Sequence, residues 1–548
     1  MTGAKLQLYS IGKENSYLTN NPQISFFKQV YMRYSNFAMQ TINLQFENIG
    51  NLSFTDTTKI KLKLDKNGDL IHKNFLEINI PAIYSTNDQS TEFHFHWANN
   101  IADIIVKNAR IIIGGHVIEE YDTEYIYIYN KLSYSVDKQL QLDKLMCKDK
   151  LKYNPQRYSS PANSADINNM LPSYEEQTIF IPLPFWFHRN IGASLPIVNL
   201  LYHDAILEIE LRPLSQLINY HIEIDTSNPP NLLKHTQIKS VENLQKDKVL
   251  AIFKNKTWNI NPILNAEYIF LDKELRKTFN KNTLQYVVEP ITKVIIQNKH
   301  GHLDVRDEPT NSMPHHPCKE IFVVPRRNDV KNTNNWLNFT NWDNYLDTSK
   351  YLDHQNYFLE LARSHVNINT SENIVNKYAE FRDNTTIISI NSSAHTIQAA
   401  DKITDTDITN LLNIWKYRDF KDIPSINANN YSHFTTNIIQ NISIDFDETN
   451  RVHKKDYLFF NKLQPYMHHN NYLEGICTYS FSIHPDKYQP SGSCNLGNIK
   501  NIRFDIDLKE INTELSNTEK YKYDVLIYMK YYNVLEIKSG MADLLFRI

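Results

Sequence analysis

The sequence predicts an all-β protein made of two consecutive β-sandwiches or barrels, with long loops and a few short helices. Short stretches in which apolar and polar residues alternate recur in both halves of the chain, as expected of strands with one buried face. The 548 residues exceed one ordinary domain of roughly 100–200 residues, so two large units fit the chain. Only 12 glycines occur, so Asn, Asp and Pro must supply most of the turns.

The first half contains the clearest strand pattern. Residues 59–64 alternate between Lys and an apolar side chain, and the alternation resumes at residues 76–80 after a polar stretch that contains Asn67 and Gly68. Because an Asn-Gly pair readily adopts the positive φ angles of a tight turn, this pattern predicts an antiparallel hairpin with one solvent-exposed face. The apolar run at residues 111–113 predicts a strand that is buried on both faces.

Strand patterns return in the second half of the chain. A further strand of the first half is expected at residues 207–211, and strands of the second half are expected at residues 321–324, 386–390, 441–446, 502–508 and 523–537. A helix is expected in only a few places, such as residues 120–132. Many short strands with few helices in each half are typical of two packed sandwiches or barrels.

A polar stretch rich in Asn, Pro, Lys and Gln separates the two halves and is the best candidate for a linker, although it could equally be a long surface loop. Four segments are therefore expected: an N-terminal base or anchor segment at residues 1–29, a first unit at 30–218, the linker at 219–247 and a second unit at 248–548. The long connections at residues 135–176 and 325–384 are expected to be functional loops.

Charge and composition restrict the function. The net charge of −3 lacks the basic excess that neutralising nucleic-acid phosphates requires, so no direct contact with nucleic acid is expected. No stretch reaches the roughly 18 apolar residues that span a bilayer, and the first residues do not form a secretion signal, so we expect synthesis in the cytosol. The four cysteines are too few and too scattered for a disulfide framework and are expected to be reduced.

Sequence motifs of common active sites are absent. The glycine spacing at residues 492–497 is that of a phosphate-binding loop, but Asn498 and Ile499 stand where Lys and Ser or Thr are needed. There is no GxSxG nucleophile elbow and no HExxH zinc helix. We therefore expect no enzyme, no catalytic residue and no cofactor.

The strongest candidate for a metal site is a pair of histidines two residues apart, which on a strand point to the same face. His300 and His302 precede three carboxylates, and two imidazoles and a carboxylate can share a metal, as in cupins. These carboxylates belong to Asp304, Asp307 and Glu308. The glycines of the cupin pattern are missing, so we interpret this stretch as a solvated loop and expect no metal.

Two other histidine groups could supply metal ligands. His315, His316 and Cys318 lie among prolines and lack a second cluster, which favours a loop. His94 and His96 flank Phe95 beside a tryptophan, which favours a packed aromatic edge over a site.

Several sequence blocks, spread in order over nearly the whole chain, resemble the major capsid proteins of nucleocytoplasmic large DNA viruses. These blocks are YLTNNPQI at residues 17–24, FFK at 26–28, IPLPFWF at 181–187, YMHH at 466–469, GICTYSF at 475–481, QPSGSCN at 489–495 and KSGM at 538–541. The resemblance implies a double jelly roll of two eight-stranded units. It also implies a structural protein that trimerises into pseudo-hexameric capsomers, which tile the icosahedral shell of a virion assembled in the host cytoplasm.

The partners implied by the resemblance are two further copies in a homotrimer, neighbouring capsomers, minor capsid and penton proteins, and an internal viral membrane. Ile24, Phe27, Val30, Tyr31 and Tyr34 have helical spacing, and this N-terminal run is expected to dock on the protein's own base or to contact minor proteins or membrane. Two alternative functions stay open at this point: a transient jelly-roll scaffold of virus assembly and a cupin-like metal-dependent enzyme.

Overall fold

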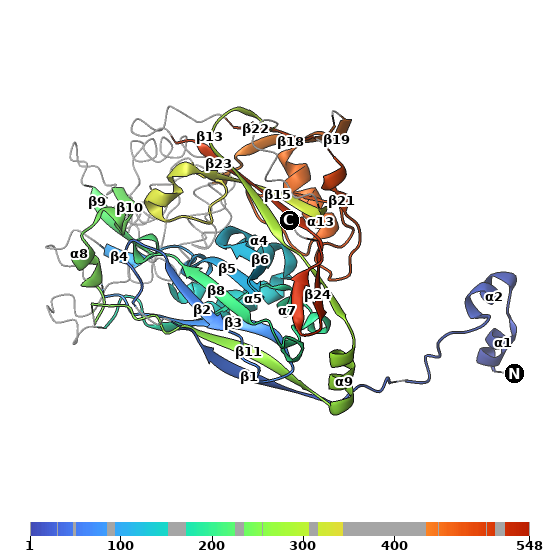
Figure 1. Cartoon of the computed structure of the whole chain (residues 1–548). Helices are drawn as coiled ribbons and strands as arrows, with labels where there is room; N and C mark the ends of the chain where they lie inside the picture. Colours follow the sequence, from blue (N-terminus) through green and yellow to red (C-terminus); the bar gives the residue numbers. More distant parts are fainter. Residues whose placement is uncertain are drawn as a thin grey trace, which may run out of the picture.

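The computed structural model describes residues 2–29, 31–47, 51–84, 94–151, 171–224, 235–254, 256–305, 316–342, 435–447, 449–499, 501–509 and 521–546. Strands dominate these residues, and the helices are short (Figure 1). The strand expected at residues 386–390 and most of the long loop at 325–384 lie outside the described residues. None of the helices in the described part of the chain has the length and apolar character needed to span a membrane.

The first unit consists of two four-stranded sheets that share one apolar core. One sheet has the order β1-β11-β3-β7 and the other has the order β2-β8-β5-β6. Their strands are β1 (Phe37–Gln45), β11 (Ile263–Leu271), β3 (Leu70–Ile80), β7 (Gln177–Pro182), β2 (Thr58–Lys63), β8 (Ala205–Leu211), β5 (Val106–Ile113) and β6 (His116–Asp122). Alternate residues of both sheets, such as Leu76 and Ile78 on β3 and Leu207 and Ile209 on β8, are fully buried in this core.

The prediction that residues 59–64 and 76–80 pair as a hairpin is wrong. β2 pairs with β8, whereas β3 pairs with β11 and β7 in the opposite sheet. The alternation does mark one buried face on each strand, but the two strands direct that face toward a shared core from opposite sides. Gly68 has no positive φ angle, and it lies in close contact with the ring of Tyr268, where a Cβ would come within 3.0 Å of Cδ1.

Two other expectations for the first unit need smaller corrections. On β5, Ile111 and Ile113 are fully buried but Ile112 is only half-buried, so this strand is not buried on both faces. The helix expected at residues 120–132 is α4 (Thr123–Ser133), which begins after β6; the Asp122 carboxylate caps it by accepting a hydrogen bond from the Tyr125 amide at 2.9 Å.

The segment expected to be a linker contains regular structure. It contains most of β9 (Ile218–Ile224), all of β10 (His235–Ser240) and η5 (Val241–Asn243), and the start of α8 (Lys246–Leu250). β9 pairs with both β10 and β4 (His94–Trp97). The next strand, β11, lies within residues 248–548, which the sequence predicts to form the second unit. In the structure it lies between β1 and β3 in a sheet of the first unit.

The second unit also contains two sheets around its own apolar core. Their orders are β13-β23-β15-β20, with β21 paired to β15, and β14-β22-β18-β19. The strands are β13 (Ile291–Lys299), β23 (Tyr523–Tyr531), β15 (Pro317–Arg327), β20 (Cys477–Ser480), β21 (Cys494–Asn495), β14 (His302–Asp304), β22 (Ile502–Leu508), β18 (Ile439–Phe446) and β19 (Thr449–Asp456).

A third small sheet joins the two units. It consists of β12 (Leu284–Val288), β24 (Asn533–Lys538) and β25 (Met541–Leu544), in the order β12-β24-β25. Its buried side chains, among them Val288 and Leu535, belong to the core of the first unit although they lie in the second half of the chain. The two units therefore share apolar packing and are held as one body.

Short helices and minor strands complete the described structure. They are α3 (Ile101–Ile104), α5 (Val136–Leu145), α6 (Lys148–Leu151), α7 (Trp186–Arg189), η2 (Ile191–Ala193), η3 (Ile197–Asn199), η4 (Leu214–Gln216), α9 (Lys273–Lys281), η7 (Asn328–Thr333), β16 (Asn341–Trp342), β17 (Thr435–Thr436), η11 (Phe459–Leu463), α13 (Gln464–His468) and η12 (Leu496–Asn498).

The N-terminal segment extends away from the rest of the molecule (Figure 1). It contains α1 (Gly3–Tyr9) and α2 (Lys13–Thr19), followed by an irregular stretch that leads into β1. The spacing of residues 24–34 indicates a helix, and that prediction is wrong. The described residues of this stretch are not helical, and they are exposed.

Candidate functional site at the junction of the two units

A group of buried charged side chains connects the two units. Glu289 directly follows β12, and its carboxylate contacts Arg189 of the first unit and Lys319 and Lys530 of the second, with Lys530 Nζ at 3.0 Å. Burial alone would raise the pKa of Glu289, but the positive charges of Lys319, Lys530 and Arg189 outweigh burial and hold this pKa well below its ordinary value. Glu289 is therefore an anion that three cations share.

A second acidic side chain continues this network within the second unit. Glu320 on β15 lies 3.0 Å from Lys530 Nζ and 3.3 Å from Nε2 of His469. Burial opposes the ionisation of Glu320, but Lys530 and His469 together lower its pKa to about 2. The side chains of Glu320, Lys530 and His469 are at most 3% exposed, so water screens these interactions very little.

His469 forms a second link between the units. Its Nδ1 lies 3.2 Å from the carboxylate of Asp486, which accepts a hydrogen bond of 2.8 Å from the Ser133 hydroxyl at the end of α4. Burial would lower the pKa of His469, but its hydrogen bonds to Asp486 and Glu320 raise this pKa to about 9. At neutral pH His469 is therefore a buried cation between two carboxylates.

Glu119 on β6 holds backbone groups of both units. Its carboxylate accepts hydrogen bonds from the amide of Trp186 at 3.0 Å and from the amide of Glu289 at 2.9 Å. Burial is the main reason that the pKa of Glu119 is raised, and the charge of Arg189 opposes that rise. Arg189 also donates a hydrogen bond of 2.7 Å to the Tyr121 hydroxyl, so it serves two partners at the junction.

Two further ion pairs join the units at the N-terminal end of α4. Lys293 on β13 lies 2.5 Å from the carboxylate of Asp122, and Arg326 on β15 lies 2.8 Å from that of Glu124. Tyr528 on β23 donates a hydrogen bond of 2.8 Å to the same Asp122. These contacts bind α4 of the first unit to one sheet of the second.

The hairpin of β24 and β25 is hydrogen-bonded to a loop of the first unit that contains Tyr202 and His203. The Tyr202 amide donates to the Gly540 carbonyl at 3.0 Å, and the Ala542 amide donates to His203 Nδ1 at 3.1 Å. Gly540 has a φ of +82°, and a Cβ there would lie 2.9 Å from side-chain atoms of Leu201 and Tyr202. Only a residue without a side chain allows this approach.

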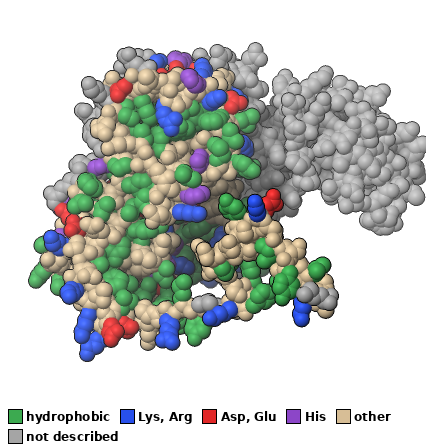
Figure 2. Space-filling model, turned by 90° about the vertical axis from the view of Figure 1, so that its right-hand side faces the viewer, with side chains coloured by type: hydrophobic (Ala, Val, Ile, Leu, Met, Phe, Trp, Pro, Cys, Tyr) green, Lys and Arg blue, Asp and Glu red, His purple; other side chains and the backbone are tan. Residues whose placement is uncertain are grey.

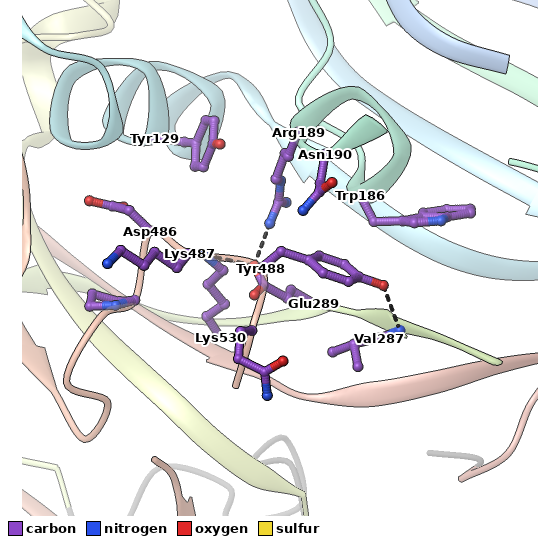
Figure 3. A pocket seen from close by; sticks show the side chains of 12 residues that line it. Tyr129, Trp186, Arg189, Asn190, Val287, Glu289, Asp486, Lys487, Tyr488 and Lys530 are labelled. Atoms are coloured by element: carbon purple, nitrogen blue, oxygen red, sulfur yellow. Dashed lines mark hydrogen bonds and ion pairs between the residues drawn. The ribbon is translucent and has the colours of Figure 1, made fainter. Parts of the chain in front are cut away.

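A pocket of about 420 Å³ opens between the two units at this junction (Figure 3). Tyr129 of α4 and Arg189 and Asn190 at the end of α7 face the segment that contains Asp486, Lys487 and Tyr488. The remaining lining residues are Trp186, Val287, Glu289, Pro485, Gln489 and Lys530. Its charged groups belong mostly to the network described above, so the pocket is the open edge of that network.

Several residues at the junction belong to the sequence blocks that resemble capsid proteins. Trp186 lies in the IPLPFWF block, His469 in the YMHH block and Gly540 in the KSGM block. The N-terminal blocks are not part of it. Sequence reasoning did not single out Glu119, Glu289, Lys319, Glu320 or Lys530. The available signal was a charged residue within an apolar strand, such as Lys530 between Met529 and Tyr531.

The strongest candidate metal ligands lie on the outer face of the second unit. His302 Nδ1 lies 2.9 Å from Asp507 and 3.3 Å from Asp505, so these three groups could in principle share an ion. Lys454 Nζ, however, lies 2.5 Å from Asp507 and already compensates its charge. Burial opposes the ionisation of Asp507, but Lys454 and His302 lower its pKa to about 2.

The other proposed ligands do not join this group. His300 is exposed, and Asp304 pairs with Arg503 at 2.9 Å. His316 stacks on Tyr531, and Cys318 is fully buried. Asp307, Glu308 and His315 lie outside the described residues.

His94 and His96 lie on β4, which pairs with β9, and both side chains are buried. His96 Nδ1 lies 2.9 Å from the Trp97 carbonyl, and burial lowers the pKa of His96 to about 3. This imidazole is therefore neutral at physiological pH, in packed surroundings.

Two family models match the chain in succession. Residues 25–272 match the major capsid protein N-terminus, and residues 276–543 match the large eukaryotic DNA virus major capsid protein. The major capsid proteins of Phaeocystis pouchetii virus and Paramecium bursaria Chlorella virus 1 are each 25% identical to the chain, with 99% of both chains covered. These matches give no support to a transient scaffold or to a cupin-like enzyme.

Solved capsid structures have the same fold. The PBCV-1 virus capsid gives a TM-score of 0.57 at 18% identity over 96% of this chain and 100% of that chain. The Faustovirus major capsid protein gives a TM-score of 0.57 at 11% identity over 96% and 94%. These neighbours confirm the double jelly roll, with the two units described above as its two halves. The chain therefore belongs to the family of large eukaryotic DNA virus major capsid proteins, which are components of the virion capsid.

Proposed function

We propose that three copies of this chain form a pseudo-hexameric capsomer, and that these capsomers tile an icosahedral shell. The observation that carries the proposal is the buried ionic junction centred on Glu289 and Lys530, which holds two jelly rolls in one fixed arrangement. Three chains with two similar units each present six units around a closed three-fold axis. A nearly hexagonal outline lets capsomers meet neighbouring capsomers through many weak lateral contacts.

The boundary between the jelly rolls is proposed to lie after β11. The pairing of β11 with β1 and β3 supports this position, and the first family model ends at residue 272. Residues 1–29 are proposed as the anchor of the capsomer base toward neighbours, minor capsid and penton proteins, or an internal membrane. Their exposed aromatic side chains, such as Tyr17 and Phe27, support contacts outside the chain's own body.

A purely structural role without metal, cofactor or direct nucleic-acid contact is part of the proposal. The near-neutral charge of −3 disfavours nucleic acid. Lys454 and Arg503 already compensate the carboxylates beside His302, which supports a face that folds without a bound metal ion. Assembly in the host cytoplasm would agree with four reduced cysteines, which are free within the structure.

Light scattering of the purified chain tests the capsomer. The expected mass is about three times the chain mass of 64.4 kDa, as a closed cyclic trimer requires. A monodisperse monomer at micromolar concentration would contradict the proposal. Detection of the chain in mature particles by mass spectrometry tests the shell itself, because a transient scaffold would be absent from them.

A further inference from the structure

The N-terminal arm, defined here as residues 2–29 and 31–36, has an apolar surface that its own chain leaves uncovered. Neither α1 nor α2 buries any residue, and helices of seven residues are marginal without a surface to pack on. The large apolar side chains of the arm are all more than 60% exposed: Leu6, Leu8, Tyr9, Ile11, Tyr17, Leu18, Ile24, Phe26, Phe27, Tyr31, Met32 and Tyr34. So much exposed apolar surface in one segment marks an interaction site.

The arm is also isolated in its hydrogen bonding. Among the described residues, the hydrogen bonds of the arm all run within it, for example from the Ser10 amide to the Leu6 carbonyl at 3.0 Å. The arm extends well clear of the body before the chain enters the edge strand β1 (Figure 1).

Part of this arm nevertheless belongs to the first jelly-roll family model. The match begins at residue 25, so Phe26 and Phe27 lie inside the domain model and are not an appended tail. Their side chains are 90% and 99% exposed in the single chain. The arm's described ring contact with the body joins Tyr34 to Phe37 at the start of β1. A segment that belongs to a domain but leaves its large apolar side chains exposed is expected to complete the same domain in another copy, as in the exchange of elements between identical protomers.

A matching apolar patch exists on the body. Leu201, Tyr202 and Met541 are between 50% and 77% exposed, and the hydrogen bond from Tyr202 to Gly540 brings the first-unit loop beside the turn of the β24–β25 hairpin, which Met541 follows. We call these three residues the C-terminal patch. Figure 2 shows that hydrophobic side chains gather on the side of the body from which the arm extends. The chain thus presents both an uncovered apolar arm and an uncovered apolar surface.

We propose that the arm of one chain covers the C-terminal patch of a second copy, so that the arms are exchanged around the trimer. The ten residue steps from Phe27 to Phe37 at the start of β1 can span up to roughly 33–36 Å, so the aromatic part of the arm can pack well away from its own β1. The contact is heterologous, because the arm meets a different surface, and a closed three-fold ring satisfies every arm and every patch. This inference rests on the proposed trimer.

Site-specific photo-crosslinking tests the exchange directly. A chain that carries p-benzoylphenylalanine at position 27 and one affinity tag is co-expressed with the unmodified chain carrying a different tag. After irradiation of the purified full-length assembly, a covalent product of two chains that carries both tags is expected, with crosslinked peptides from the C-terminal patch. Crosslinks confined to one chain would overturn the exchange, as would crosslinking only to added lipid vesicles.

Substitutions test the energetics of the same contact. Phe26→Ser with Phe27→Ser, or Tyr202→Ser with Met541→Ser, should each weaken the trimer by roughly tenfold or more, measured by analytical ultracentrifugation over a dilution series. The quadruple variant should be no weaker than either pair, because both pairs remove one contact. Independent, multiplicative effects would overturn the inference.

A control variant and the oligomeric state of the unmodified protein distinguish failure of the arm exchange from failure of the trimer proposal. Tyr466→Ser removes an aromatic side chain that is 86% exposed and lies outside both surfaces, so it should leave the trimer unchanged. If the unmodified protein is a monomer, the proposed capsomer itself fails. If it is a trimer whose crosslinks stay within one chain, only the arm exchange fails.

Discussion

The Nζ atom of Lys530 lies 3.0 Å from a carboxylate oxygen of Glu320, and the two side chains are only 2% and 3% exposed. Lys530 also lies 3.0 Å from Glu289, so one ammonium group neutralises two buried carboxylates on different segments of the chain. Removing one member of such a group is far more costly than its net contribution suggests, because the remaining charges lose their compensation without regaining water.

The first prediction is that Lys530→Met strongly destabilises the protein. The substitution leaves Glu289 and Glu320 with one cation fewer, and loss of one partner of a buried pair costs about 3–5 kcal/mol. A fall in the melting temperature by several degrees is expected in differential scanning calorimetry. Lys63→Met is the control, because Lys63 and Asp204 are both about half exposed and their pair should contribute little. Equal effects of the two substitutions would contradict the role of the buried network.

The second prediction concerns pH. The pKa of His469 is raised from its ordinary 6.5 to about 9 in the folded chain, so the folded state binds the proton more tightly than the unfolded state. Its stabilising contribution, on the order of 3 kcal/mol, is therefore fully present below pH 6.5 and is lost as the pH rises through about 9. The partners that face this imidazole are Glu320 and Asp486, and the Phe322 ring lies beside it.

His469→Gln provides the comparison for this pH dependence. The variant has no titrating group at this position, so its melting temperature should lie below that of the unmodified protein by the largest margin near pH 6. The margin should begin to narrow above about pH 6.5, where the unfolded chain loses its proton, and should be almost gone above about pH 9, where the folded chain loses it too. A margin that stays constant over this range would show that His469 is not charged in the folded state.

The strands could be predicted from the sequence more reliably than their partners. Residues 502–508 alternate in sequence, and β22 has the same alternation of buried and half-buried side chains. Alternation reveals which side chains face a core, but it does not reveal which sheet holds the strand. For that reason the hairpin of residues 59–64 with 76–80 was wrong, since β2 and β3 lie in opposite sheets.

The junction could not be predicted in the same way. A charged residue inside an apolar strand, such as Lys319 or Lys530, is unfavourable when considered alone. It becomes favourable only beside an anionic partner that is far away in the sequence, as Glu289 is from Lys530. The helical spacing of residues 24–34 was misleading for another reason: these apolar side chains are exposed, so their spacing does not reflect packing of a helix on the chain's own core.

The third prediction is that stability does not require a metal. Dialysis against EDTA should leave the melting temperature unchanged, because Lys454 already compensates Asp507 beside His302. Elemental analysis should then find substoichiometric metal. The prediction would be wrong if one zinc, iron or manganese ion per chain remained bound and was lost on His302→Ala. Lys454→Ala serves as a comparison, since it removes the competing cation and leaves the three candidate ligands in place.

The last prediction separates two glycines with the same backbone angle. Gly475 and Gly115 both have a φ of +86°, a conformation that side chains adopt rarely. A Cβ at Gly475 would lie 2.3 Å from the carbonyl oxygen of Phe339, whereas a Cβ at Gly115 would meet no atom within 4 Å.

Gly115→Ala should therefore cost only the backbone strain of about 1–2 kcal/mol. Gly475→Ala must also displace a backbone segment packed in the first core, to which Phe339 belongs. We expect a clearly larger fall in melting temperature for Gly475→Ala, with reduced soluble expression. Equal falls for the two variants would mean that backbone strain alone explains the glycine at position 475, and that the contact with Phe339 contributes nothing.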